Sequence, residues 1–523
     1  MPSRTCCVRP AGCLGLRAAR WGALLIAAAI LAWGGGLSAN GRFPTAQQLL
    51  EDPKDPRHLV LRATYGVLTT YDAGANWSLI CEEAVDYQPN EDPVLGLMDN
   101  GNLIASTFKG LALSQDGGCS WQRAIGGGME PLEIVDVTVE PGNRTNAFAL
   151  VAQLIHAQQA YVHQIWASTD NGLTWRARGS PWGADRELVG FAFEAAPSDP
   201  RRIYISATQA RGVGFELDGV LRRSDDGGVT WSTLPIAGTD SSHVPYLSAV
   251  SPSNPDVLYV RVQGSDDDVL LQSLDGGKSW QERLRGRAMM AGFALSPDGS
   301  QIAIGFGRPL LPRQKTVIDC SLLGVWIAST QDFLFSRVPG LNGSVHCLTW
   351  TNHGLYACTG HKDHGFALAV SGDAGNSFVP LMELDAVAGL QACPPTSAVA
   401  SQCAEPWLRL CPIVGKPCAG QRLDPTTGVN DPNGTLSMCQ GVVDAGPPPD
   451  AGPPAAGAGA QGPAASGTAS PPPLPNAPSS GCGCQTSGTR ASGHLLWALV
   501  LIGAVVQLLR RLGHSEQEPA GKR

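Results

Sequence analysis

An eight-residue motif recurs along this chain and restricts its fold more than any other feature. Four copies read SQDGGCSW from residue 114, STDNGLTW from 168, SDDGGVTW from 224 and SLDGGKSW from 273. Six clear copies align on an aspartate at the third position: Asp72, Asp116, Asp170, Asp226, Asp275 and Asp373. They are spaced by about 40 to 55 residues, except for one gap of about two periods. Midway in that gap stands STQDFLF, residues 329–335, which we interpret as a decayed seventh copy with Gln331 in place of the aspartate.

A second, independent pattern gives the same count. Each copy is preceded by a turn between two apolar runs, most visibly in AVSPSNPDVLYVRV (249–262) and FALSPDGSQIAIGF (293–306). Similar turns fall at residues 53–56, 99–102, 141–145, 197–200 and 351–354. Seven turns therefore pair with seven copies, so the number of units does not depend on the decayed motif.

The composition of the octet indicates a turn between two antiparallel strands. Its aspartate can accept hydrogen bonds from nearby backbone amides, and its glycine can take the left-handed conformation that side chains resist. The Ser or Thr hydroxyl adds a local bond, and the terminal Trp can pack between neighbouring sheets. Units of this length with several short strands predict an all-β, seven-bladed β-propeller, which we assign to residues 40–384.

The octet closely resembles the Asp-box, or BNR, repeat, whose pattern is SxDxGxTW. The resemblance implies a propeller of the sialidase-like, sortilin-like or photosystem II assembly factor-like type. Those relatives include hydrolases, receptors and assembly chaperones, so the fold leaves the function open. On this reading the six octet aspartates are structural.

The residues give little support for an enzyme. A sialidase adds an arginine triad, a tyrosine nucleophile with a nearby glutamate, and an N-terminal RIP motif; the nearest string here is SRVP at 336–339, where we interpret Arg337 as a surface arginine. A glycosidase needs two carboxylates facing one cleft. The acidic candidates Glu82, Glu83 and Asp86, and the run 266–268, are typical of solvated loops. No catalytic residue is assigned, and a glycoside hydrolase on the same scaffold remains the alternative.

Metal, cofactor and nucleic-acid sites are not indicated either. The octet lacks the alternating oxygen ligands and the distal Glu of a calcium loop. His361 and His364 have a spacing that metal ligands can show, but they belong to a charged loop sequence, GHKDHG. No phosphate-binding loop occurs, and we expect no cofactor. With a net charge of -8 and no long basic run, the chain lacks the clustered positive face that nucleic acid requires.

Both ends of the chain resemble targeting signals. Residues 1–39 combine arginines, an apolar run and small residues, which predicts a signal peptide cleaved after Ala39; a membrane anchor is the alternative. Residues 442–480 form a Pro/Ala/Gly-rich linker, and residues 481–523 contain GCGC, a short hydrophobic helix and an arginine pair. This order resembles the myxobacterial C-terminal sorting signal (MYXO-CTERM). The resemblance implies processing near Cys482 or Cys484 and anchoring at the cell surface or outer membrane; an ordinary C-terminal anchor remains open.

The cysteines agree with export. Ten of them lie between Cys81 and Cys439, and an even number in an exported chain indicates disulfides. Cys347 and Cys358 sit symmetrically about a turn, so a hairpin would place them opposite each other. Cys81 and Cys119 are a second candidate pair. We interpret residues 385–441 as a small Cys-rich module held by its own disulfides; a zinc site is the competing view.

We therefore expect a non-catalytic, surface-anchored propeller that binds a protein or glycan of the cell envelope. If the octets close the hairpins between third and fourth strands, they occupy one face, and ligand contacts should come from the other. The candidate regions there are the 82–87 loop, the stretch around Trp182, the 243–246 region and the insertion at 308–319. Ring closure should involve a strand near residues 43–50 or one after Phe378.

Overall fold

The structure, a computed structural model, describes residues 45–88, 91–124, 132–155, 160–183, 188–211, 216–309, 318–383 and 386–412. The predicted signal peptide with Ala39, the linker, and the sorting segment with Cys482 and Cys484 lie outside these residues. Within them, no helix is both long and apolar enough to cross a membrane.

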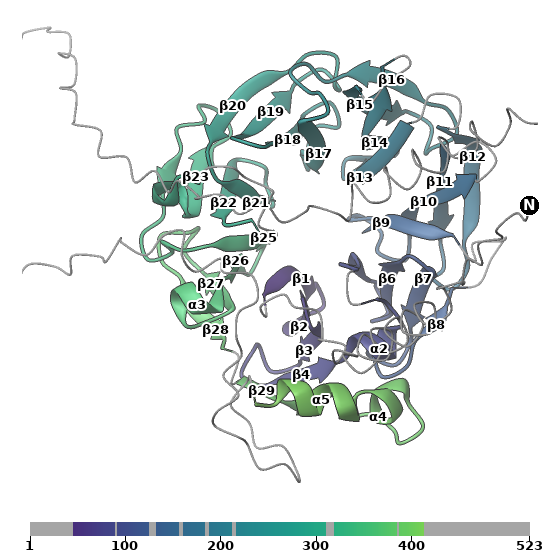
Figure 1. The fold of residues 1–523 in the computed structure, drawn as a ribbon, viewed down its shortest axis with the longest axis vertical. Coiled ribbons are helices and arrows are strands. Elements are labelled where there is room, and N and C mark those ends of the chain that lie inside the picture. The colour runs from purple at the N-terminus through teal and green to yellow at the C-terminus, as the bar shows by residue number, and fades with distance from the viewer. Residues whose placement is uncertain are drawn as a thin grey trace, which may run out of the picture. The chain divides into compact units, whose positions relative to one another are not determined.

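The chain forms the predicted seven-bladed β-propeller (Figure 1). Each blade is a sheet of four consecutive antiparallel strands. Blade 1 contains β1 (Ala46–Asp52), β2 (Asp55–Ala63), β3 (Gly66–Thr70) and β4 (Trp77–Ile80). Blade 2 contains β5 (Leu95–Leu97), β6 (Leu103–Thr107), β7 (Gly110–Ser114) and β8 (Gln122–Arg123). Blade 3 contains β9 (Glu133–Val139), β10 (Ala147–Ile155), β11 (Ala160–Ser168) and β12 (Arg176–Trp182). Blade 4 contains β13 (Leu188–Ala196), β14 (Asp199–Ala210), β15 (Leu217–Ser224) and β16 (Ser232–Pro235).

The remaining blades follow the same plan. Blade 5 contains β17 (His243–Val250), β18 (Leu258–Gly264), β19 (Asp268–Ser273) and β20 (Gln281–Gly286). Blade 6 contains β21 (Met289–Leu295), β22 (Gln301–Gly307), β23 (Gly324–Ser329) and β24 (Ser336–Arg337). Blade 7 contains β25 (Val345–Thr351), β26 (Gly354–Thr359), β27 (Leu368–Ser371) and β28 (Val379–Met382). Short helices occur between strands: α2 (Glu82–Val85), η1 (Cys320–Leu322) and α3 (His361–His364).

The octets join the third and fourth strands of their blades and therefore all lie on one face, here called the octet face. The turn between the first and second strands ends on the same face, and the two turns are bonded: Gly227 N donates to Arg201 O at 2.8 Å. The other face, here called the opposite face, carries the connections between second and third strands and between blades. The first strand of each blade lines the propeller axis (Figure 1) and runs from the opposite face to the octet face.

Each intact octet is a closed hydrogen-bonded turn. The Ser or Thr hydroxyl donates to the aspartate at 2.7 to 2.9 Å and accepts the glycine amide at 2.7 to 3.1 Å. The same aspartate accepts the backbone amide four residues later at 2.8 to 2.9 Å. In Asp226 the bonds from Thr230, then those from Ser224 and Val229, lower the pKa to about 2. The aspartate is therefore occupied within its own turn.

The octet glycine also forms a contact between blades. A Cβ atom at Gly172 in blade 3 would lie 2.9 Å from Ile104 of blade 2, and one at Gly228 in blade 4 would lie 3.3 Å from Ile165 of blade 3. The other intact octets repeat this contact with the blade before them, in the pairs Gly74–Leu381, Gly118–Ile80, Gly277–Leu221 and Gly375–Ile327. In the decayed copy Phe333 stands at the position of the glycine, with φ 55°. The centre of its ring lies 6.4 Å from the centre of the Tyr259 ring in blade 5.

The ring is closed by contacts at both edges of blade 1, the outer and the inner. After blade 7, strand β29 (Val387–Leu390) adds in parallel to β4 at the outer edge of blade 1. At the inner edge, Glu51 of β1 accepts hydrogen bonds from two blade 7 residues, Thr351 at 3.0 Å and Tyr356 at 2.8 Å. Of the two predicted closing segments, the one after Phe378 thus supplies an added strand, whereas β1 begins blade 1.

The disulfides confirm one predicted pair and correct the other. Cys347 and Cys358 are directly opposite in the β25–β26 hairpin and are bonded. The pairing of Cys81 with Cys119 is wrong, because Cys81 is bonded to Cys403 and Cys119 to Cys393. Sequence proximity misled the prediction, since the partners lie 322 and 274 residues away along the chain.

The residues after blade 7 do not form a separate module as far as the structure describes them. They contain β29 and two helices, α4 (Ala398–Gln402) and α5 (Ala404–Leu410), which lie along blade 1 (Figure 1). Val399 and Cys403 are buried in one cluster with Ile80 and Val85 of the propeller. We call this segment, residues 386–412, the clasp.

Candidate functional site

A cavity of about 320 Å³ lies in the axial channel, lined by residues of blades 1, 4, 5, 6 and 7, most of them on inner strands. Its described lining residues are Gln47, Ala192, Tyr246, Leu247, Ser248, Arg261, Leu270, Met290, Ala291, Gly292, Phe293, Ile304, His346, Cys347 and Leu348. Gln47, Met290 and His346 are each the second residue of their inner strand. Because these strands start at the opposite face, the cavity extends toward that face, away from the octets.

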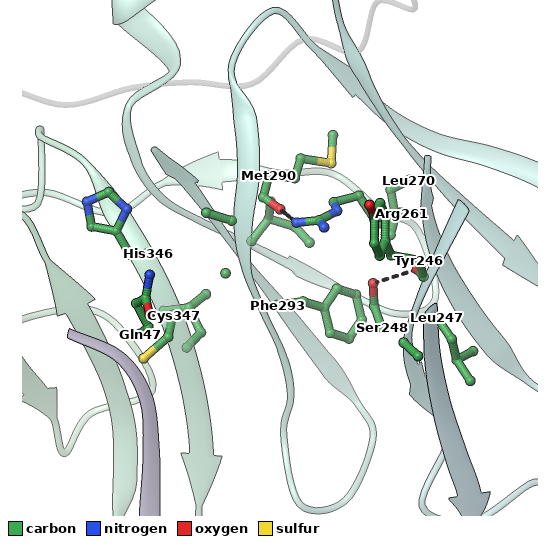
Figure 2. Close-up of a pocket in the computed structure, with 15 residues that line it drawn as sticks. Gln47, Tyr246, Leu247, Ser248, Arg261, Leu270, Met290, Phe293, His346 and Cys347 are labelled. Carbon is green, nitrogen blue, oxygen red and sulfur yellow. Dashed lines mark hydrogen bonds between the residues drawn. The ribbon is translucent and has the colours of Figure 1, made fainter. Parts of the chain in front are cut away.

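One side of the cavity combines aromatic rings with a cation (Figure 2). The Arg261 guanidinium lies 4.9 Å from the centre of the Tyr246 ring, a cation–π distance. Its Nη1 group donates a hydrogen bond to the carbonyl oxygen of Met290 in the next blade. Phe293 lies on the same side of the cavity. These contacts hold the arginine at the seam between blades 5 and 6.

The other side carries Gln47 and His346 (Figure 2). The Oε1 atom of Gln47 accepts a hydrogen bond of 2.7 Å from Arg62, which orients the amide. Burial lowers the pKa of His346 to about 4, against a smaller opposing effect of Asp363, so its imidazole is neutral at neutral pH. Asp363 itself is paired with Arg308 at 2.6 Å.

Two carboxyl groups on neighbouring inner strands, Asp136 and Glu194, influence each other electrostatically. Asp136 of β9 accepts backbone amides of Val137 at 2.8 Å and Phe193 at 3.0 Å, which ties blade 3 to blade 4. Burial raises the pKa of Asp136 to about 7. Burial and the Asp136 charge together raise the pKa of Glu194 on β13 to about 8, and its Oε2 atom accepts a bond of 3.4 Å from Thr138.

This pair predicts that the propeller loses stability as the pH rises. A carboxyl group whose pKa is higher in the folded than in the unfolded protein destabilises the fold when it ionises. The loss of stability therefore grows from about pH 4, near the pKa in the unfolded chain, to about pH 8, near the pKa in the folded protein. We expect the stability of the Glu194→Gln variant to fall less with pH over this range. At pH 9 the variant should have a higher thermal midpoint of unfolding than the native protein. Glu405→Gln, at a side chain 81% exposed, is the control. If the stability of the native protein and of Glu194→Gln changed equally with pH, the proposed effect of the Asp136–Glu194 pair would be contradicted.

Most sequence-predicted binding regions are occupied by contacts within the protein. In the 82–87 loop, Asp86 pairs with Lys109 and Arg123, both at 2.5 Å. Trp182 is half-buried and stacks on His163 with ring centres 4.8 Å apart. Of the insertion at 308–319, residues 310–317 lie outside the described residues. Only the 243–246 region reaches the cavity, through Tyr246.

The remaining individual candidates also have protein partners. Arg337 donates to the carbonyl oxygen of Leu323 at 2.7 Å, as a structural arginine would. His364 accepts the Gly343 amide at 3.1 Å. Among the described residues, no group of three or more His, Cys, Asp or Glu side chains is placed to hold a metal ion.

Sequence reasoning missed Gln47, Arg261, Phe293 and His346. Each stands in an ordinary strand, and no local motif marks it. Only the alignment of inner strands around one axis brings residues from five blades together.

Comparison with known proteins does not identify a family. No protein-family model and no curated protein matches the chain. Among solved structures, an ancestral GH74 enzyme is 14% identical over 65% of this chain and 46% of its own, with a TM-score of 0.45. A puromycin-hydrolysing peptidase of Mycobacterium tuberculosis is 12% identical over 69% and 55%, with a TM-score of 0.43. YCF48 of Cyanidioschyzon merolae is 13% identical over 60% and 93%, with a TM-score of 0.38.

This chain spans about half the length of the first two structures. The order of the strands in its seven sheets shows that the chain is a seven-bladed β-propeller.

Proposed function

We propose that this protein is a non-catalytic β-propeller that binds a protein or glycan of the cell envelope through its axial cavity. The observation that carries the proposal is the composition of that cavity. Tyr246, Phe293 and Arg261 line one side of the cavity, and the polar groups of Gln47 and His346 line the other. Concave sites that bind ligands combine apolar surface with a few placed polar groups in this way.

The alternative, a glycoside hydrolase, draws on the Asp136 and Glu194 carboxyl groups. A hydrolase needs one carboxyl group as an acid and a second that is free to act on substrate or water. Both oxygens of Asp136 accept backbone amides that join two blades, so this side chain is engaged in holding the ring. This engagement favours the binding role.

We also propose that the protein is exported and held at the cell surface through its C-terminal segment. The disulfides Cys81–Cys403, Cys119–Cys393 and Cys347–Cys358 support export, because such bonds persist in oxidising compartments. Mass spectrometry of the mature protein tests anchoring: processing near Cys482 or Cys484 is expected, and an intact tail through Arg523 would refute it.

The binding role is tested by capture of envelope proteins and polysaccharides on the immobilised exported chain. Ala291 lines the cavity, so Ala291→Phe should fill it without removing a packed side chain. Leu334→Ala, at a side chain 76% exposed in the octet of blade 6, is the matched control. We expect native protein and control to retain the same ligand and Ala291→Phe to lose it. Retention by Ala291→Phe, or turnover on a panel of glycosides, would refute the proposal.

A further inference from the structure

The axial cavity offers hydrogen-bond donors and few acceptors. Among the described residues, the hydrogen bond that Arg261 donates goes from Nη1 to the carbonyl oxygen of Met290, and Arg261 is one of the residues that line the cavity. Arg62 donates a hydrogen bond to the oxygen of the Gln47 amide, so the amide nitrogen is the end that can bond a ligand. Arginine has no acceptor atom, and an amide nitrogen only donates. Two separate inner-wall positions therefore present donors.

Acceptor groups near these donors are already used. Among the described lining residues none is Asp or Glu. The nearby carboxylate of Asp268 is fully buried and accepts the backbone amides of Gly264 at 3.3 Å and Met290 at 2.8 Å. The Ser248 hydroxyl donates to the Tyr246 carbonyl oxygen at 3.4 Å. His346, being neutral, contributes one donor and one acceptor. A ligand group that only accepts hydrogen bonds would match this lining.

We infer that the cavity takes a carboxylate-bearing sugar, a uronate unit of an acidic polysaccharide. This inference rests on the proposed binding function and specifies its ligand. The carboxylate would accept from Arg261, because charge-assisted bonds to guanidinium are the strongest available there. The non-polar face of the sugar ring would lie against Phe293, because the Arg261 guanidinium already lies over the Tyr246 ring.

The size of the cavity favours a sugar acid over an acidic amino-acid side chain. A cavity of about 320 Å³ has room for many water molecules. An aspartate or glutamate side chain would displace only a few of these water molecules and would leave the aromatic side of the cavity hydrated. A sugar ring with its carboxylate reaches both walls and displaces most of the water.

The test is calorimetric titration of the exported chain with tetragalacturonate and with the same oligosaccharide after reduction of its carboxylates to alcohols. The charged probe should bind, and the reduced probe should bind at least about tenfold more weakly, as expected for the loss of a charged hydrogen bond. Arg261→Gln should lose the same factor for the charged probe only. The control Arg211→Gln removes an exposed arginine paired with Asp218 and should bind like the native protein.

The outcomes separate this inference from the proposed function. Equal binding of the charged and reduced probes, or unchanged binding by Arg261→Gln, would overturn the carboxylate assignment. Binding of a polyglutamate peptide, with no binding of the oligosaccharide, would overturn the assignment of a sugar as the ligand. If envelope capture still depends on Ala291 while neither acidic probe binds, the inference fails and the binding function stands. If capture does not depend on Ala291, the proposed function itself fails.

Discussion

Removing the Cys81–Cys403 bond by the double substitution Cys81→Ala, Cys403→Ala is expected to lower the free energy of unfolding by about 4 kcal/mol. Because Cys119 stays bonded to Cys393, the Cys81–Cys403 bond closes a loop of about 50 residues, 81–119 and 393–403, and so still restricts the unfolded chain. Both side chains are almost fully buried, and the bond holds the clasp against the end of β4. Urea unfolding of the purified exported chain measures the change.

The control for the clasp is the double substitution Cys347→Ala, Cys358→Ala. That bond spans only 11 positions within one hairpin, so its loss should cost less, about 2 to 3 kcal/mol. Limited proteolysis provides a second readout, because loss of the Cys81–Cys403 bond should expose α4 and α5, which follow the remaining Cys119–Cys393 bond, to cleavage while blade 7 stays intact. Equal losses in the two variants, with an intact clasp, would show that the Cys81–Cys403 bond does not secure ring closure.

Trp175→Ala is expected to lower the free energy of unfolding by about 3 to 5 kcal/mol. The indole ends the blade 3 octet, is 1% exposed, and packs in one cluster with Leu113 of blade 2 and Ile134 of blade 3. Its Nε1 group donates to Gly172 O at 2.9 Å. The substitution therefore opens a cavity in the seam between two blades.

Two further variants separate packing from hydrogen bonding at this site. Trp175→Phe keeps most of the apolar contact and loses the Nε1 bond, so a loss of about 1 kcal/mol is expected. Leu274→Ala, at an octet residue that is 53% exposed, should change stability by less than about 0.5 kcal/mol. A cost at Trp175→Ala as small as that at Leu274→Ala would contradict a role of the octets in joining blades.

The octets were readable from sequence because their chemistry is local. In SDDGGVTW, Ser224, Asp226 and Thr230 bond to one another and to amides within the same eight residues. No distant residue has to be known for such a turn to be recognised. The paired turns before each octet are equally local, which is why the blade count could be predicted even though blade 6 lacks the octet aspartate and tryptophan. The contact of each octet glycine with the preceding blade was not predicted, because it depends on two neighbouring sheets.

The disulfides show the limit of local reasoning. The Cys347–Cys358 pair could be predicted because both residues belong to one hairpin, whose turn places them in register. The partners of Cys81 and Cys119 could not, because they arrive with the clasp, after six further blades for Cys81 and five for Cys119. Cysteine spacing contains no information about where a chain returns to its starting point.

The amino-acid sequence by itself determined the all-β class, the seven blades and the face on which the octets lie. The tertiary structure alone decided which side chains line the axis. The inner strands β13, β17, β21 and β25 each contain a register irregularity next to the cavity, at 190–192, 247–249, 290–292 and 345–347. A bulge inserts one residue and reverses the alternation of side chains beyond it. Whether Ser248, Phe293 or His346 faces the axis therefore depends on bulge positions, which apolar alternation in the sequence does not reveal.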